Sequence, residues 1–312
     1  MQRSGAANPA RPWQGCVVTA PFAATLCGYR NNGNPSTSDN SDAGSIEWGH
    51  AMFQALGVEP GSPQISNVGT MMESAVAEHL ESVRPDLIIR QSRPAMDFEQ
   101  YRHLGVFRQF QRSYRQPSDE LELVLRDLQQ LPPSPAITEA TARIQAVRES
   151  VDENHGLVSQ LVGTMPEESM LKIDITVGAP DSLARLLVGL SSKWTLRTDR
   201  AQDCISQGAK LVNLRRGHMP HYAVLTMEPR PAMLKLIAYG SGAVDCVYHL
   251  ALAELRSAAE TIEAQRGGSW SPRVMLERMV AQRRVRPYQE LVDEIKRLPI
   301  CGTAIAGSDE KS

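Results

Sequence analysis

Residues 170–177, MLKIDITV, carry apolar side chains at every second position. Because neighbouring side chains of a β-strand point to opposite faces, this period predicts a strand with one buried and one polar face. The stretch at 183–196, LARLLVGLSSKWTL, follows a turn, and its later half predicts a second strand. The two strands predict an antiparallel hairpin, in which a turn centred near residue 183 places Asp174 opposite Lys193. The chain must therefore build a β-sheet around this pair.

Helices and strands alternate along the second half of the chain, which is typical of an α/β domain. We predict further strands at 221–227 and 234–240, and helices at 46–56, 70–83, 198–214 and 244–264. Residues 86–168 are expected to be mostly helical. We expect one folded domain over residues 15–306, a disordered N-terminus at 1–14 and a loose tail at 307–312.

The composition is that of an ordinary globular protein, because 42% of the 312 residues are hydrophobic. Aromatic residues make up 5%, which argues against a surface that stacks single-stranded bases. The formal net charge of −2 neither indicates nor excludes a nucleic-acid partner, since positive charge can gather in one cleft. The five cysteines show no metal-ligand spacing, and no segment resembles a leader or a membrane span. We expect reduced thiols and a cytoplasmic protein.

Asp174 and Lys193 are the first candidates for chemistry. A carboxylate beside a lysine at a sheet edge can hold a divalent cation and position a water for attack on a phosphate. A surface ion pair between neighbouring strands is the simpler interpretation when the hairpin is considered alone.

The segment SSKWTLRTDRAQ, residues 191–202, adds a second pattern directly after the lysine. Arg197 and Arg200 can each bind one guanine in the major groove, and Asp199 can accept from the amino groups of adjacent cytosines. Two guanines and two cytosines are what each half of a CCGG palindrome presents. Taken alone, this pattern is also compatible with a solvated helix start.

Three stretches of the sequence closely resemble the CCGG group of type II restriction endonucleases. They are SSKWTLRTDRAQ (191–202), ISQGAKLVNLRRGHMPHYAVLTMEP (205–229) and GSGAVDCVYHLALAEL (240–255). These tetrameric, type IIF-like enzymes belong to the PD-(D/E)XK nuclease superfamily. The resemblance implies an α/β fold with a PD-(D/E)XK restriction-endonuclease-like core, in which helices flank a central mixed β-sheet. It further implies a single endonuclease domain, with DNA-contacting loops at 31–69 and a helical insertion at 86–168.

At matching positions the resemblance implies that Lys193 is the catalytic lysine and Asp174 the metal-binding aspartate. Glu73 matches an acidic residue that joins the active site from an N-terminal helix. Gln207 stands where the family has a glutamate of the metal site, and Asp203, one turn earlier on the same helix face, is a candidate to compensate.

For DNA recognition, the resemblance assigns the CCGG core to Arg197, Asp199 and Arg200. Gln64 resembles a glutamine that touches the minor groove. Asp39, Asp42 and Arg230 are candidates for the outer base pairs, because an aspartate can face cytosine while an arginine faces guanine. GCCGGC, RCCGGY and ACCGGT all remain open as the full site.

The expected function is Mg²⁺-dependent hydrolysis of double-stranded DNA, with one or two ions per active site and a cut before the first C that leaves four-base 5′ overhangs. A homodimer or homotetramer and a cognate DNA methyltransferase are the expected partners. The alternative is a sequence-specific DNA-binding protein whose cleavage is impaired because Gln207 replaces the glutamate. A small-molecule α/β enzyme lacks support, since GSG at 240–242 is too short for a dinucleotide fingerprint.

Overall fold

The computed structural model describes residues 19–106, 109, 117–164, 171–180 and 184–299, which form two compact units. Unit 1 comprises Met1–Pro94 together with Lys172–Ser312, and unit 2 comprises Ala95–Leu171. The ends predicted to be disordered or loose, 1–14 and 307–312, lie outside the described residues. The single endonuclease domain over 15–306 therefore stays a prediction.

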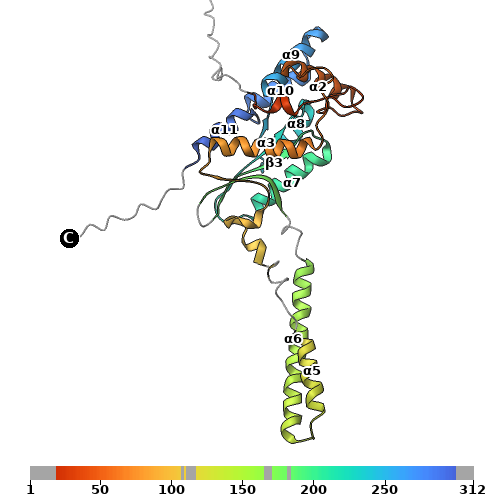
Figure 1. Ribbon diagram of the computed structural model, residues 1–312, viewed down its shortest axis with the longest axis vertical. Helices are drawn as coiled ribbons and strands as arrows, with labels where there is room; N and C mark the ends of the chain where they lie inside the picture. Colours follow the sequence, from red (N-terminus) through yellow and green to blue (C-terminus); the bar gives the residue numbers. More distant parts are fainter. Residues whose placement is uncertain (1–18, 107–108, 110–116, 165–170, 181–183, 300–312) are drawn as a thin grey trace, which may run out of the picture. The chain divides into compact units, whose positions relative to one another are not determined.

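A six-stranded mixed sheet forms the centre of unit 1 (Figure 1). Its strands lie in the order of the sequence: β1 (Ile88–Pro94), β2 (Lys172–Gly178), β3 (Leu186–Lys193), β4 (His221–Thr226), β5 (Cys246–His249) and β6 (Val285–Pro287). The pairs β1–β2 and β2–β3 are antiparallel, whereas β3, β4, β5 and β6 run parallel. The carboxyl ends of these four parallel strands therefore meet at one edge of the sheet.

The hairpin of β2 and β3 is present, but its predicted register is wrong by two residues. Ile175 pairs with Leu190, so the same register brings Asp174 level with Ser191 instead of Lys193. The physical reason lies in the turn, where the amide of Ala179 donates to the carbonyl of Arg185 at 2.9 Å. Because this bond fixes Ala179 opposite Arg185, β3 pairs with β2 through earlier residues than predicted, and a bulge between Val177 and Gly178 accompanies the change of register.

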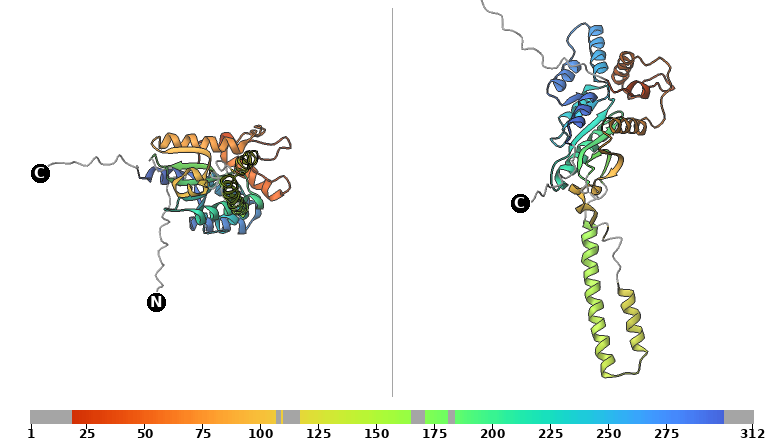
Figure 2. Two further views of the ribbon diagram at one scale, coloured as in Figure 1. Left: turned by 90° about the horizontal axis from the view of Figure 1, so that it is seen from below. Right: turned by 60° about the vertical axis from the view of Figure 1, so that its left-hand side comes forward.

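Helices cover both faces of the sheet, with α3 (Val68–Val83) on one side and α7 (Thr198–Leu214) on the other (Figure 2). The helix α3 begins two residues before its predicted start and buries Met72, Val76 and Leu80 at helical spacing. The remaining helices of unit 1 are α1 (Ala23–Leu26), α2 (Ala43–Leu56), α8 (Pro231–Ala238), α9 (Leu252–Arg266), α10 (Ser271–Ala281) and α11 (Tyr288–Arg297). These layers confirm the predicted α/β class with a central mixed sheet.

The predicted strand at 234–240 is wrong, because these residues belong to the helix α8 and the turn after it. Leu234, Ile237 and Ala238 are buried at the spacing of one helix face. Pro231 occupies the first turn, where its missing N–H costs nothing and its fixed φ favours the helix.

The predicted helix at 244–264 is wrong over its first part. Cys246–His249 form β5, a strand whose four residues are all buried, and α9 begins only at Leu252. A central parallel strand is covered on both faces, so it shows no alternation of apolar and polar residues. The strand β6 and the helices α10 and α11 were not predicted.

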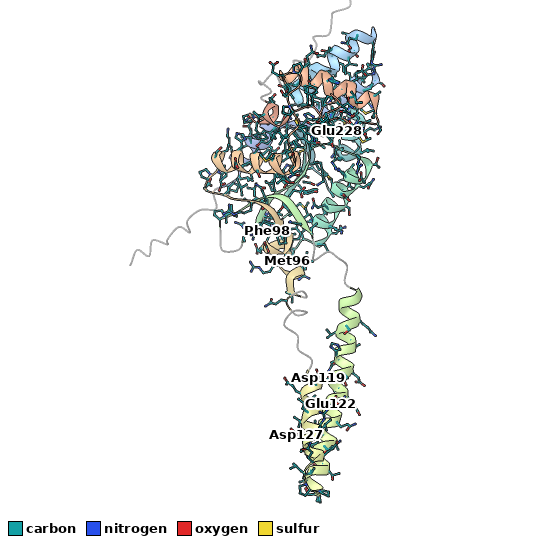
Figure 3. All side chains as sticks on the ribbon, turned by 45° about the vertical axis from the view of Figure 1, so that its right-hand side comes forward. Met96, Phe98, Asp119, Glu122, Asp127 and Glu228 are labelled. Carbon is teal, nitrogen blue, oxygen red and sulfur yellow. The ribbon has the colours of Figure 1, made fainter. Side chains whose placement is uncertain are left out.

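Unit 2 contains two short 3-10 helices, η1 (Ala95–Asp97) and η2 (Glu99–Tyr101), and two long helices, α5 (Ser118–Gln129) and α6 (Pro135–Thr164). The helices α5 and α6 pack together as a hairpin, in which Leu125 is the buried side chain of α5. Asp119, Glu122 and Asp127 follow one another along α5 (Figure 3). Residues 86–168 are largely helical where they are described, but β1 within them was not foreseen.

Three of the five cysteines, Cys27, Cys204 and Cys246, lie in the described part of the chain as buried free thiols. Within the described part of the chain, no helix combines the length and the apolar character needed to cross a lipid bilayer.

Candidate active site and DNA interface

Asp174 accepts three hydrogen bonds at a single carboxylate oxygen, Oδ2. The donors are the Ser191 hydroxyl at 3.1 Å, the Ser192 amide at 2.8 Å and the Lys193 Nζ at 3.0 Å. Lys193 reaches this oxygen as a diagonal neighbour on the same face of the two strands. The predicted Asp174–Lys193 pair therefore forms in spite of the shifted register. The side chains of Lys193 and Asp174 are 23% and 25% exposed, so the pair remains accessible to a ligand.

Glu73 approaches this pair from α3 and is half-buried. Burial raises the pKa of Glu73, and the negative charge of Asp174 raises it further, while Lys193 and Lys172 act in the opposite direction. The structure thus brings together two of the predicted carboxylates and the predicted lysine. The second oxygen of Asp174, Oδ1, has no hydrogen-bond partner among the described residues.

Gln207 lies on α7 with both ends of its amide engaged. Its Oε1 accepts a hydrogen bond of 2.7 Å from the Tyr222 hydroxyl, and its Nε2 donates to the carbonyl of Lys172. Tyr222 is fully buried, and burial raises the pKa of its phenol, so this hydroxyl remains a donor. The Tyr222 hydroxyl also lies beside the Ser191 hydroxyl, which donates to Asp174. Gln207 is therefore connected to Asp174 through the hydroxyl groups of Tyr222 and Ser191.

Asp203 is exposed on α7. Among the residues that the structure describes, no three or more His, Cys, Asp or Glu side chains are placed to hold one metal ion. Asp174, Glu73 and Asp203 therefore do not form one three-carboxylate set among the described residues, whereas Asp174 and Glu73 lie near enough for the charge of Asp174 to raise the pKa of Glu73.

The predicted CCGG-reading residues lie where β3 leads into α7. Arg197 immediately precedes the helix, and Asp199 and Arg200 lie in its first turn. Arg197 and Asp199 are 63% and 64% exposed, and they form an ion pair at 3.3 Å. The backbone amide of Arg200 and the charge of Arg197 lower the pKa of Asp199, so Asp199 is ionised and can act as an acceptor. These side chains are therefore available to base edges.

Two adjoining hollows connect Lys193 to residues 194–200, which lead from β3 into the first turn of α7 and are called the reading segment below. The larger, of about 430 Å³, is lined in part by Gln64, Lys193 and Arg200. The smaller, of about 230 Å³, is lined in part by Asp39, Arg197 and Arg230. Arg30 and Arg200 line both hollows, which makes them parts of one surface. Arg30 was not predicted, because a single arginine before a polar loop carries no recognisable signal.

Arg230 is only 12% exposed, and its guanidinium contacts both predicted acidic residues of the N-terminal loop. The Nη1 atom lies 3.1 Å from Oδ2 of Asp42 and 3.9 Å from Oδ2 of Asp39. Asp42 also caps α2, because its Oδ1 accepts from the amide of Ser45 at 3.1 Å. The Nε atom of Arg230 donates to Glu228, a fully buried carboxylate that sequence reasoning missed.

A mixed sheet between helix layers, with an aspartate–lysine pair on the antiparallel strands at the start of its parallel half, defines the restriction-endonuclease-like class of α/β proteins. The chain belongs to the NgoMIV restriction enzyme family, whose family model matches residues 64–294. It is similar to a curated protein, the Type II restriction enzyme NgoMIV of Neisseria gonorrhoeae, with 47% identity over 77 residues. This alignment spans 25% of the chain and 27% of the relative's length. Both comparisons confirm the predicted resemblance to type II restriction endonucleases.

Proposed function

We propose that this chain is a type II restriction endonuclease that hydrolyses phosphodiester bonds of double-stranded DNA at a palindrome with a CCGG core. One observation carries the proposal: the lysine of the Asp174–Lys193 pair and the reading segment share a single connection between a strand and a helix. Lys193 is the last residue of β3, and Arg197 immediately precedes α7. A base pair held by Arg197 or Arg200 would therefore place a nearby phosphate within the hollow that Lys193 lines.

The catalytic roles follow from the contacts of the pair. Lys193 supplies a positive charge at the phosphate and stabilises the negative charge that develops there during hydrolysis. The triple acceptance at Oδ2 fixes the orientation of Asp174 and leaves its second oxygen, Oδ1, without a hydrogen-bond partner among the described residues. Glu73 adds a second carboxylate, whose pKa is raised by burial and by Asp174.

These two carboxylates fit a Mg²⁺ ion, which binds proteins through one or two carboxylates and keeps waters and phosphate oxygens as its other ligands. A bound cation would relieve the repulsion between Asp174 and Glu73. When bound, Mg²⁺ neutralises the phosphate and lowers the pKa of its water. One or two ions per site are compatible with this arrangement. Gln207 and Asp203 are assigned supporting positions beside it on α7.

For recognition, we assign the guanines of CCGG to Arg197 and Arg200 and the cytosines to Asp199. Asp39, Asp42 and Arg230 form one cluster beside this segment and are assigned to the outer base pairs. Gln64 lines the catalytic hollow and is assigned to the minor groove. By resemblance, cleavage falls before the first C and leaves four-base 5′ overhangs. By resemblance too, the enzyme is a homodimer or homotetramer paired with a DNA methyltransferase.

A second candidate function is sequence-specific DNA binding with impaired cleavage. The observation that favours it is the engagement of Gln207, whose amide is held by Tyr222 and by the carbonyl of Lys172. A glutamine in this position brings no negative charge, so metal affinity is lower than with a third carboxylate.

Digestion of plasmid DNA that carries CCGG sites with varied flanks, in Mg²⁺ and in Ca²⁺, tests both candidates when it is followed by sequencing of the ends. Discrete Mg²⁺-dependent cuts at one flanked CCGG support the endonuclease and identify the outer base pairs. Site-specific binding without cuts supports the second candidate. Neither binding nor cutting at any CCGG site refutes both.

Two variants serve as matched controls for the digestion. Lys193→Ala should abolish the cuts while site-specific binding in Ca²⁺ persists. Lys210→Ala removes the same charge from an exposed position of α7 and should cut like the parent. Equal cutting by both variants would refute the catalytic role of Lys193.

A further inference from the structure

Glu228 follows β4 and is fully buried inside unit 1, surrounded by side chains (Figure 3). Four N–H groups converge on its carboxylate. Three belong to Arg230: the amide at 3.0 Å, Nε at 2.7 Å and Nη2 at 3.3 Å. The fourth is the amide of Leu196, which donates to Oε2 at 2.7 Å. All hydrogen bonds that the described residues make to this buried carboxylate therefore come from two of them, Arg230 and Leu196.

Glu228 and Arg230 together hold the backbone of one residue of the reading segment, Leu196, at both its amide and its carbonyl. The amide of Leu196 is held by Glu228, while its carbonyl accepts from Nη2 of Arg230 at 2.7 Å. The side chain of Leu196 is fully buried as well. Arg197 is the next residue, so the exposed side chains of Arg197 and Asp199 follow directly after the fixed backbone of Leu196.

The backbone amide and the backbone carbonyl of Glu228 both form hydrogen bonds. Its amide donates to the Thr226 hydroxyl at 3.0 Å, and its carbonyl accepts from Nε2 of His249 at 3.1 Å. Nδ1 of His249 accepts from the amide of Ala251 at 3.1 Å, which leaves the ring neutral. Burial lowers the pKa of His249 to about 4, in agreement with a neutral ring. The clamp on Leu196 is therefore anchored to the carboxyl ends of β4 and β5.

We propose that Glu228 is a positioning residue for DNA sequence recognition, because it fixes the backbone of Leu196, directly and through Arg230, immediately before Arg197, Asp199 and Arg200. This inference rests on the proposed function. A buried ion pair is weak support for stability, since apolar residues of similar volume often serve equally well. The best-attested role of a buried ion pair is to select one conformation of the chain. Here the selected conformation is that of the reading segment.

Glu228→Gln tests the proposal with almost no change in shape. The amide group turns N–H groups toward other donors, so at least one contact to Leu196 or Arg230 must break. Binding is measured in Ca²⁺ to a CCGG duplex and to a duplex with one core base pair exchanged. We expect the ratio of the two affinities to fall by about tenfold or more, which corresponds to about 1.4 kcal/mol. Affinity for the exchanged duplex should change little.

Glu277→Gln is the matched control, because it removes a carboxylate that holds Arg256 through two hydrogen bonds of 2.7 and 2.8 Å away from the reading segment. This control should keep the discrimination of the parent. Arg230→Lys is the second variant. Lysine keeps the positive charge, but its single ammonium group cannot replace the several nitrogens with which the guanidinium binds both Glu228 and the Leu196 carbonyl. Arg230→Lys should lower the ratio of affinities for the CCGG duplex and the exchanged duplex. This variant keeps the proposal testable if Glu228→Gln fails to fold.

A double-mutant cycle separates positioning from general support of the fold. If Glu228 acts through the readers, Glu228→Gln should have little further effect on discrimination in an Arg197→Ala background. An equal loss of affinity for both duplexes, or unchanged discrimination in Glu228→Gln and Arg230→Lys, overturns the inference and leaves the proposed function intact. A parent protein that shows no preference for CCGG overturns both.

Discussion

Replacing Gln207 by glutamate should increase the affinity of the protein for divalent cations without a large loss of stability. The substitution keeps the shape of the side chain and adds one negative charge. It removes one hydrogen bond, from Nε2 to the carbonyl of Lys172. It retains the bond from the Tyr222 hydroxyl, 2.7 Å from Oε1, and places a charged acceptor there.

The two changes in hydrogen bonding nearly cancel. The lost neutral bond contributes about 1 kcal/mol. A bond to an ionised acceptor is about twice as strong as a neutral one, so the Tyr222 bond gains about 1 kcal/mol. The metal-free variant should therefore stay within about 1 kcal/mol of the parent. For a domain of this size, that difference moves the Tm by about 2–4 °C.

The effect on metal binding should be larger. At an effective dielectric constant of about 20, a divalent charge and a carboxylate attract each other by about 4 kcal/mol even at roughly 8 Å. The loss of hydration opposes this gain, so we expect an affinity at least about tenfold higher, or about 1.4 kcal/mol. Cleavage in limiting Mg²⁺ should rise in parallel.

Calorimetric titration with Ca²⁺ measures the affinity directly, and thermal unfolding in EDTA measures the cost to the metal-free fold. Gln202→Glu is the matched control, because it adds the same charge at an exposed position of the same helix. Ca²⁺ binding to Gln207→Glu that is no tighter than binding to Gln202→Glu would refute the placement of Gln207 beside the metal site.

Three further outcomes are expected. Asp199→Asn should cost about 1–3 kcal/mol of discrimination at the cytosines of CCGG, measured by competition between duplexes; unchanged discrimination would refute its role. Because burial and Asp174 raise the pKa of Glu73, its ionisation destabilises the metal-free fold; in EDTA, Glu73→Gln should gain stability over the parent as pH rises above 4.5, and a constant difference would contradict this. Burial lowers the pKa of His221, but contacts with Asp245 and Cys246 raise it to about 9. The protonated imidazole therefore stabilises the fold fully below pH 6.5, and this stabilisation is lost as pH rises through about 9. Urea unfolding of His221→Gln should show no such loss, and the same loss in the variant would contradict this.

The sequence predicts those elements whose burial pattern is regular. The helix α7 has the predicted bounds, and β2 and β4 differ from prediction by one or two residues. The strand β5 was taken for part of a helix, because four fully buried residues have no period that separates strand from helix. The edge strand β1, IIRQSRP, buries few residues and was read as part of a helical region.

The grouping of the candidate site residues was predicted more completely than the contacts that support them. Asp174, Lys193 and Glu73 converge although the predicted register was wrong, because a lysine side chain is long enough to reach a diagonal neighbour. Glu228 escaped prediction for a physical reason. A glutamate after a strand has no local pattern that shows burial, and its role arises from a loop 32 residues away in sequence.

The two ends of unit 2 lie beside one another. Pro94 and Lys172 are paired across β1 and β2, and the amide of Ala95 donates to the carbonyl of Leu171 at 2.7 Å. A segment that leaves and re-enters a sheet at adjacent positions can be lengthened, shortened or exchanged at small entropic cost, since closing its loop is already achieved by the strand pair. The junction at 94 and 172 is therefore the point at which we expect genetic fusion to insert a foreign domain without interrupting the pairing of β2 with β3.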